Sequence, residues 1–206
     1  IPVSASNLVN LTSLNIGNNG YVGSFPAPVT SLTKLEVLNL EGNNFNSTIP
    51  ETIGDLGNLK YLNLGNNNFT GSIPVTICNL QQLENLNFGR NQLTGNLPGV
   101  METNVSVMHP INTSYSIGML IHLKELYLHS NQLASEVTES IGNNLTNLEV
   151  LDLSENLFYG SIPANIGQLT ELRKLSLGSN VFESSIPKTI TNLTKLQTLS
   201  LHHNKL

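Results

Sequence analysis

The chain has 206 residues, of which 39% are hydrophobic and only 11% are charged, and its formal net charge is -5 at pH 7. Ordinary soluble domains carry about 25% charged residues, so this composition predicts a polar but weakly charged surface. Such a charge balance favours neither nucleic acid nor an anionic membrane as a partner. The apolar runs are too short for a membrane span, and the opening "IPVSASNLVN" lacks the pattern of a signal peptide.

A pattern of about 24 residues, LxxLxLxxNxFxGxIPxxIGxLxx, returns along the whole chain. Full repeats start at residues 11, 35, 59, 83, 123, 148 and 172, between a partial repeat over residues 1–10 and a truncated repeat over residues 196–206. One such unit cannot bury its own apolar face, so successive units must stack into a solenoid. We therefore predict a single solenoid domain over residues 1–206.

The LxL part of each repeat predicts a short strand. In residues 37–41, Leu38 and Leu40 alternate with residues that would point outward, which is the period of a half-buried strand. An asparagine follows each strand where the chain must turn, and its amide can satisfy backbone groups there. We expect a structural role for these residues: Asn19, Asn43, Asn67, Asn91, Asn131, Asn156, Asn180 and Asn204.

Behind the asparagine, the repeats continue with an aromatic or leucine residue, in four of them an Ile-Pro pair, and a short helical turn. Ile49-Pro50 and its equivalents predict extended segments on the far side of the solenoid. We expect the ring positions to stack as a column in the core: Tyr21, Phe45, Phe69, Phe158 and Phe182. Cys78, the only cysteine, is expected to be a small buried residue, which excludes an internal disulfide and a cysteine-based metal site.

Two stretches carry a resemblance to a known family. "LNLGNNNFTGSIPVTICNL" and "LDLSENLFYGSIPANIGQL" resemble the plant-type leucine-rich repeat, which the Gly-x-Ile-Pro segment distinguishes from other repeat subtypes. The resemblance implies an α/β solenoid, a right-handed curved superhelix with a parallel β-sheet on the concave face and short helical turns and Ile-Pro segments on the other sides. It also implies an extracellular or cell-surface protein that recognises a ligand, without enzymatic activity and without a cofactor.

Within that family, the chain is expected to be an internal fragment of a receptor-like kinase or receptor-like protein ectodomain, because it lacks the family's cysteine caps. Its signal and any membrane anchor would lie outside this chain. The expected partner is a protein or peptide ligand, with a carbohydrate or a co-receptor as further possibilities. The alternatives are a secreted binding protein, such as a polygalacturonase-inhibitor-like defence protein, and a structural or ice-interacting surface protein. Thr52, Thr76 and Thr189 recur in only some repeats, which is irregular for an ice-matching array.

No catalytic motif is present, and the five histidines are scattered, so we expect neither an active site nor a metal site. His202 and His203 are adjacent, and strand alternation predicts that they point to opposite sides.

If the chain binds a ligand, the outward strand positions should carry the contacts, and bulky side chains gather there around the fifth repeat. The candidate contacts are Tyr61, Glu125, Tyr127, His129, Asp152 and Lys174. Ordinary variation on an exposed face is the alternative interpretation.

Sequons of the form Asn-x-Ser/Thr occur at Asn10, Asn46, Asn68, Asn104, Asn112, Asn144 and Asn192. Roughly five are expected by chance from this composition, so their number adds little to the extracellular interpretation. We expect some of them to be glycosylated.

The period breaks once, between Leu83 and Leu123, where sixteen residues exceed the usual spacing. We interpret residues 101–116 as an insertion loop in the fourth repeat, which is either functional or a tolerated insertion. The following repeat is also irregular, because Val137-Thr138 replaces Ile-Pro and one extra residue precedes Leu148. We predict that the loop and the fifth strand form one irregular patch.

Overall fold

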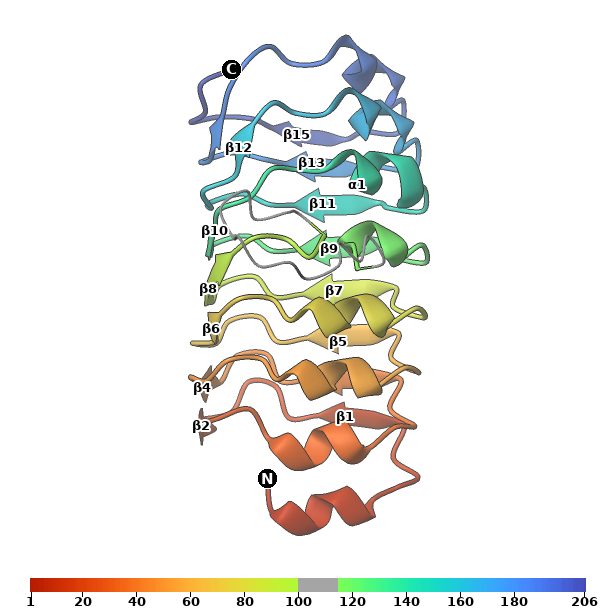
Figure 1. The fold of residues 1–206 in the computed structure, drawn as a ribbon, viewed down its shortest axis with the longest axis vertical. Helices are drawn as coiled ribbons and strands as arrows, with labels where there is room; N and C mark the ends of the chain where they lie inside the picture. Colours follow the sequence, from red (N-terminus) through yellow and green to blue (C-terminus); the bar gives the residue numbers. More distant parts are fainter. Residues whose placement is uncertain (100–114) are drawn as a thin grey trace, which may run out of the picture.

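The computed structural model describes residues 1–99 and 115–206. The repeats stack in chain order, with the helical turns in front of a large parallel sheet and the termini at opposite ends of the stack (Figure 1). The strand order in this sheet is β1-β3-β5-β7-β9-β11-β13-β15. Its strands are β1 (Ser13–Asn15), β3 (Val37–Asn39), β5 (Tyr61–Asn63), β7 (Asn85–Asn87), β9 (Glu125–Tyr127), β11 (Val150–Asp152), β13 (Lys174–Ser176) and β15 (Thr198–Ser200).

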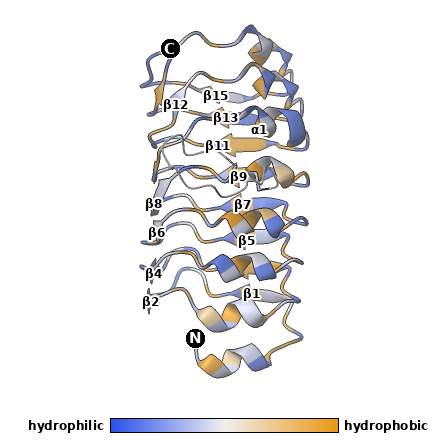
Figure 2. Ribbon diagram, in the orientation of Figure 1, coloured by the Kyte–Doolittle hydropathy of each residue, from blue (hydrophilic) through white to orange (hydrophobic). Residues whose placement is uncertain are grey.

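All neighbours in this sheet pair in parallel at equivalent positions of the repeat. Leu38 of β3 lies opposite Leu62 of β5, which in turn lies opposite Leu86 of β7. These leucines are buried and belong to one continuous apolar core. Hydrophobic residues recur in successive layers of the stack (Figure 2). The predicted leucine-based solenoid with a parallel sheet is confirmed.

A second row of very short strands follows the large sheet, and the sequence analysis did not anticipate it. These strands are β2 (Val22–Gly23), β4 (Asn44–Phe45), β6 (Thr70–Gly71), β8 (Gln92–Gly95), β10 (Gln132–Leu133), β12 (Tyr159–Gly160) and β14 (Val181–Phe182). They form three small parallel sheets along one side of the stack in Figure 1. Their pairing holds the repeats together beyond the LxL strands.

The recurring asparagines join one repeat to the next. The side-chain oxygen of Asn67 accepts the backbone N–H of Phe45 at 3.1 Å, and its amide nitrogen donates to the carbonyls of Leu40, Leu64 and Gly65 at 3.0 to 3.2 Å. Asn67 is buried, so these bonds satisfy backbone groups that water does not reach. The predicted structural role of the asparagines is confirmed.

The predicted aromatic column is also confirmed. Phe45 and Phe69 stack with ring centroids 6.0 Å apart, and Phe158 and Phe182 stack at 6.3 Å. Tyr21 stacks on Phe45 at the N-terminal end but is 40% exposed, because no earlier ring lies beyond it among the described residues.

Short helical turns form the face opposite the large sheet. The 3-10 turns are η1 (Val3–Asn7), η2 (Ala27–Ser31), η3 (Glu51–Asp55), η4 (Val75–Asn79), η5 (Ile117–Met119), η6 (Ala164–Gln168) and η7 (Lys188–Asn192). The α-helix α1 (Glu139–Asn144) takes the equivalent place in the irregular repeat, where a wider turn accommodates the extra residue. Neighbouring turns pack so closely at a glycine that there is no room for a side chain. A Cβ on Gly167 would lie 2.3 Å from the carbonyl oxygen of Thr189.

The predicted insertion lies almost wholly outside the described residues, which resume at Tyr115. Its two ends are held together, because the backbone N–H of Ile117 donates to the carbonyl of Pro98 at 3.1 Å. Ser116 begins η5, where its hydroxyl accepts the backbone N–H of Gly118 and lies 2.9 Å from the hydroxyl of Ser140. Ser116 therefore belongs to the packed turn and not to the loop.

Candidate ligand-binding face

The outward side chains of the large sheet form columns that run from repeat to repeat, and we call this surface the sheet face. The register fixes the first two columns. The first column is Ser13, Val37, Tyr61, Asn85, Glu125, Val150, Lys174 and Thr198, and the second is Asn15, Asn39, Asn63, Asn87, Tyr127, Asp152, Ser176 and Ser200.

Tyr61 on β5 and Tyr127 on β9 flank β7 from either side. The outward residues of β7 are the short Asn85 and Asn87, so the two aromatic side chains rise on both sides of a low strand. Two strand spacings separate β5 from β9, which is about 9.6 Å. This distance leaves room for one extended ligand segment or side chain above β7.

Glu125 lies beside Tyr127 and is bonded across the strands. One carboxylate oxygen accepts a hydrogen bond from the side-chain amide of Asn85. Partial burial raises the pKa of Tyr127 to about 12, with further contributions from the Glu125 and Asp152 carboxylates. The phenol therefore stays neutral at physiological pH and keeps its hydroxyl as a donor and acceptor.

Asp152 and Lys174 form an ion pair, with 2.8 Å between the Lys174 ammonium nitrogen and an Asp152 oxygen. The other Asp152 oxygen accepts from the Ser154 hydroxyl at 2.6 Å and from its backbone N–H at 3.2 Å. Burial alone would raise the pKa of Asp152, but the bonds from Lys174 and Ser154 outweigh it and lower the pKa. Asp152 is only 6% exposed, so Lys174 is the member of this pair that a ligand can reach more readily.

The imidazole of His129 lies directly over Gly89 of the preceding repeat, where a Cβ would come within 2.6 Å of Nε2. Its Nδ1 lies 3.1 Å from the Ser130 hydroxyl. His202 covers Gly178 in the same way at the C-terminal end. A glycine just after one strand thus makes the space that a histidine just after the next strand fills.

The prediction that His202 and His203 point to opposite sides is wrong. Their rings are in edge contact, with centroids 5.1 Å apart. The reason is that β15 ends at Ser200, and His203 adopts a left-handed conformation with φ of 53°. Strand alternation no longer applies at these positions.

A groove of about 290 Å³ adjoins Tyr61 and Glu125 along the edge where the strands begin. Its other wall comes from Lys60, Glu84 and Lys124. These three belong to a series of residues that directly precede the strands and alternate in charge, which we call the rim ladder: Glu36, Lys60, Glu84, Lys124, Glu149 and Arg173. They pair as Glu36–Lys60 at 2.8 Å, Glu84–Lys124 at 2.7 Å and Glu149–Arg173 at 3.1 Å.

The sequence analysis missed the rim ladder, although the signal is present in the sequence. Aligning the repeats and reading the one position before each strand gives the alternation of acidic and basic residues. These pairs are about half exposed, and exposed ion pairs contribute at most about 1 kcal/mol each. The ladder therefore defines the charge of the groove wall more than the stability of the fold.

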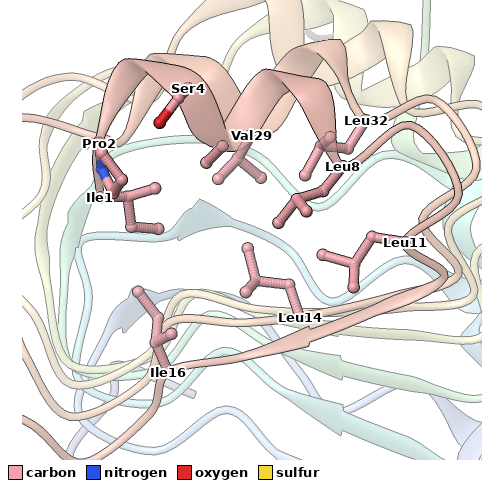
Figure 3. Close-up of a pocket in the computed structure, with 10 residues that line it drawn as sticks. Ile1, Pro2, Ser4, Leu8, Leu11, Leu14, Ile16, Val29 and Leu32 are labelled. Atoms are coloured by element: carbon pink, nitrogen blue, oxygen red, sulfur yellow. The ribbon is translucent and has the colours of Figure 1, made fainter.

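A second cavity, of about 350 Å³, lies at the N-terminal end of the stack. Figure 3 shows its lining side chains facing one another between the first two helical turns and the first strand. Leu14, Ile16 and Val29 belong to or pack against the core, and the lining is almost wholly apolar. This cavity is the first layer of the core seen from its end, without the polar groups that orient a specific ligand.

Five sequon asparagines fall within the described residues, and all five are exposed: Asn10, Asn46, Asn68, Asn144 and Asn192. None of them lies on a strand of the large sheet. Asn104 and Asn112 lie outside the described residues. Glycans at the described positions would leave the sheet face open.

The recurring threonines on the helical turns use their hydroxyls inside the protein. The Thr76 hydroxyl donates to the carbonyl of Glu51 at 2.6 Å, and the Thr189 hydroxyl donates to the carbonyl of Ala164. Hydroxyls that join repeats in this way are not presented as a regular outward array.

Over residues 1–99 and 115–206, no three His, Cys, Asp or Glu side chains group as metal ligands. None of the helices in this part of the chain has the length and apolar character needed to cross a bilayer. Cys78 is buried, as predicted, and burial raises the pKa of its thiol to about 12, which leaves it in the unreactive protonated form.

Comparison with known proteins supports the assignment of the chain as a leucine-rich repeat solenoid. A family model for a leucine-rich repeat region matches residues 103–205, and a second leucine-rich repeat model matches residues 33–93. Comparison with curated protein sequences gives no match.

Similar solved structures include the plant peptide hormone receptor RGFR1 in complex with RGF2, with 32% identity and a TM-score of 0.86 over 99% of this chain and 30% of that chain. The Arabidopsis receptor kinase HAESA, in complex with the peptide hormone IDA and the co-receptor SERK1, gives 31% identity and a TM-score of 0.85 over 99% of this chain and 32% of that chain. A plant ice-binding protein is 24% identical with a TM-score of 0.75 over 99% of this chain and 60% of that chain, which shows a shared fold alone.

The chain thus spans about a third of the length of either receptor chain. The two matching family models both describe repeats, and neither is a catalytic family. Since the first of these models covers half of the chain, and receptor structures more than 30% identical cover nearly all of it, the protein belongs to the leucine-rich repeat family.

Proposed function

We propose that the chain is the ligand-recognition part of an extracellular receptor ectodomain, and that it binds a peptide or protein segment on the sheet face. In this proposal residues 1–206 act as one solenoid domain, the insertion in the fourth repeat ends at residue 115, and the chain performs no catalysis. A secreted binding protein without a membrane anchor would use the same face in the same way.

The observation that carries the proposal is the placement of Tyr61 and Tyr127 on either side of β7. Aromatic side chains at the centre of a surface are typical anchors of protein and peptide ligands. Tyr61 and Asn85 of β7 also line the groove beside Glu125. An extended segment lying across the strands would contact both rings.

The position of the exposed sequons supports the sheet face as the binding surface. Glycans at the five described positions would cover other sides of the solenoid. Two similar receptors, RGFR1 and HAESA, are described in complex with the peptides RGF2 and IDA, which makes a peptide the first class of ligand to test.

The test is selection of binders from a displayed random peptide library, with the full 206-residue chain as bait. We expect bound peptides to lose at least about tenfold in affinity on Tyr127→Ala or Tyr61→Ala, as for a central aromatic anchor. The matched control is Tyr159→Ala, because Tyr159 lies on β12, is 42% exposed and is far from the sheet face. Thermal unfolding of each variant verifies the fold. Failure to select any peptide, or equal binding by all variants, would contradict the proposal.

A further inference from the structure

The charges on the sheet face are unbalanced among the described residues. Its charged side chains are Glu125, Asp152 and Lys174 in the two columns, together with Glu41, which lies two positions beyond Asn39 at the end of β3. Lys174 and Asp152 neutralise each other as an ion pair. Glu41 and Glu125 have no basic partner in the described part of the chain, so the face presents two uncompensated carboxylates.

Both carboxylates are oriented by amides and not by cations. The Glu125 carboxylate accepts from Asn85, and the Glu41 carboxylate accepts from the amide of Asn63 at 2.9 Å. An amide donor fixes the position of a carboxylate but leaves its negative charge intact. Each group is therefore held ready for a positively charged partner.

The nearest lysines do not supply that partner. Lys60 and Lys124 both line the groove beside Glu125, but each is bonded to an acidic residue of the preceding repeat, at 2.8 Å and 2.7 Å. Their alternation with Glu36 and Glu84 keeps the rim ladder neutral. The carboxylate of Glu125 remains the unmatched charge of the groove.

Aromatic rings stand next to this charge. Tyr127 is close enough to Glu125 for the carboxylate to contribute to its raised pKa, and Tyr61 lies in the same column as Glu125, two strands away. The amide of Asn63 also donates to the Tyr61 hydroxyl at 3.1 Å, which fixes the position of that ring. A cation beside a carboxylate and the face of a tyrosine ring gains both ion pairing and a cation–π interaction.

We propose that this part of the sheet face recognises a basic side chain of a peptide ligand, an arginine or a lysine, with Glu125 as its ion-pair partner and Tyr61 and Tyr127 as its aromatic walls. Glu41 lies three strands along the stack, at least about 14 Å away, and accepts a second basic side chain. An extended peptide advances about 3.4 Å per residue, so the two basic residues would be at least four positions apart. This inference rests on the proposed peptide-binding function.

The experiment repeats the peptide selection with the wild-type chain and with Glu125→Gln. The matched control is Glu51→Gln, because Glu51 is exposed on η3 on the opposite side of the solenoid. We expect wild type and Glu51→Gln to select peptides enriched in arginine and lysine at two positions, and Glu125→Gln to lose that enrichment at one of them. Replacing the selected arginine by the uncharged citrulline should weaken binding about tenfold or more on wild type, and by less than about threefold on Glu125→Gln.

The outcomes separate the two proposals. Peptides that depend on Tyr127 but show no basic enrichment would overturn the cation assignment and leave peptide recognition in place. A citrulline effect of equal size on wild type and Glu125→Gln would overturn the role of Glu125. Selection of no peptide that depends on the sheet face would overturn both proposals.

Discussion

The backbone N–H of Ile117 donates to the carbonyl oxygen of Pro98 at 3.1 Å, although nineteen positions separate the two residues in the chain. In the repeat that starts at residue 35, the equivalent bond joins Ile53 to Pro50 over three positions, at 3.0 Å. The Ile53 bond closes the first turn of η3, and the Ile117 bond occupies the equivalent place at the start of η5. The ends of the extra segment therefore meet with the geometry of an uninterrupted repeat.

This relationship predicts that residues 100–115 can be removed without loss of the fold. The deletion joins Gly99 to Ser116 and gives the turn the length found at Pro50–Ile53, while Ser116 keeps its bonds to Gly118 and Ser140. We expect the midpoint of thermal unfolding to change by only a few degrees, which corresponds to about 1 kcal/mol. A loss of the cooperative transition in circular dichroism would contradict this expectation. A deletion that extends through Ser116 serves as the comparison and should be less stable.

Replacing a buried asparagine of the repeat should be severely destabilising. In Asn67→Ala, the backbone N–H of Phe45 loses its partner in the interior, and a buried group left unpaired costs about 1 to 3 kcal/mol. The carbonyls of Leu40, Leu64 and Gly65 each lose one of two donors. We expect a loss of about 2 to 3 kcal/mol in the free energy of unfolding in urea. Asn19→Ala is the control, because exposed Asn19 bonds only two carbonyls of its own turn. Equal losses in the two variants would refute the inter-repeat role.

The glycine of the helical turn should tolerate no side chain. A Cβ on Gly167 would lie 2.3 Å from the Thr189 carbonyl oxygen, so Gly167→Ala must push two turns apart, at a cost of about 1 to 3 kcal/mol. Gly57 has no heavy atom within 4 Å of such a Cβ, and Gly57→Ala should leave stability nearly unchanged. Chemical unfolding of the two variants side by side provides the measurement. A Gly167→Ala variant as stable as the wild type would show that the turns separate freely.

The ion pair on the sheet face predicts a dependence of stability on pH. The folded-state pKa of Asp152 lies below its value in the unfolded chain, about 3.9, so the unfolded state takes up a proton first as the pH falls. The contribution of Lys174 to stability is therefore present above about pH 4 and disappears as the pH falls through the folded pKa. We expect Lys174→Met to destabilise the protein near neutral pH but not in acid, and to raise the pKa of Asp152 in an NMR titration. Lys195→Met, which removes an exposed pair with Glu171, should have little effect at any pH.

The sequence predicts those features that every repeat contains. Leu62 and Asn67 recur at a fixed spacing, so their burial and bonding follow from the period together with the alternation of a strand. The contacts of His129 with Gly89 and of Lys60 with Glu36 involve residues of two different repeats, and no single repeat contains them. Such contacts can be predicted only after the register is known, because the register decides which residues become neighbours.

In the candidate site too, some features follow from a single repeat and others depend on the register between repeats. The bulk of Tyr61 and Tyr127 marks them in the sequence, and strand alternation places them outward. Their position on either side of β7 depends on the sheet register. Alternation also places Asp152 outward, but it does not predict the burial of this residue, which arises from side chains on the adjacent strands and from the pairing with Lys174.

The rim ladder limits how this gene can gain or lose repeats. Its acidic and basic members alternate, so removing one repeat would place Lys60 beside Lys124, or Glu84 beside Glu149, where opposite charges now meet. Removing two consecutive repeats would restore the alternation. For this stretch of the solenoid, a pair of repeats is therefore the unit whose gain or loss keeps opposite charges adjacent along the rim ladder.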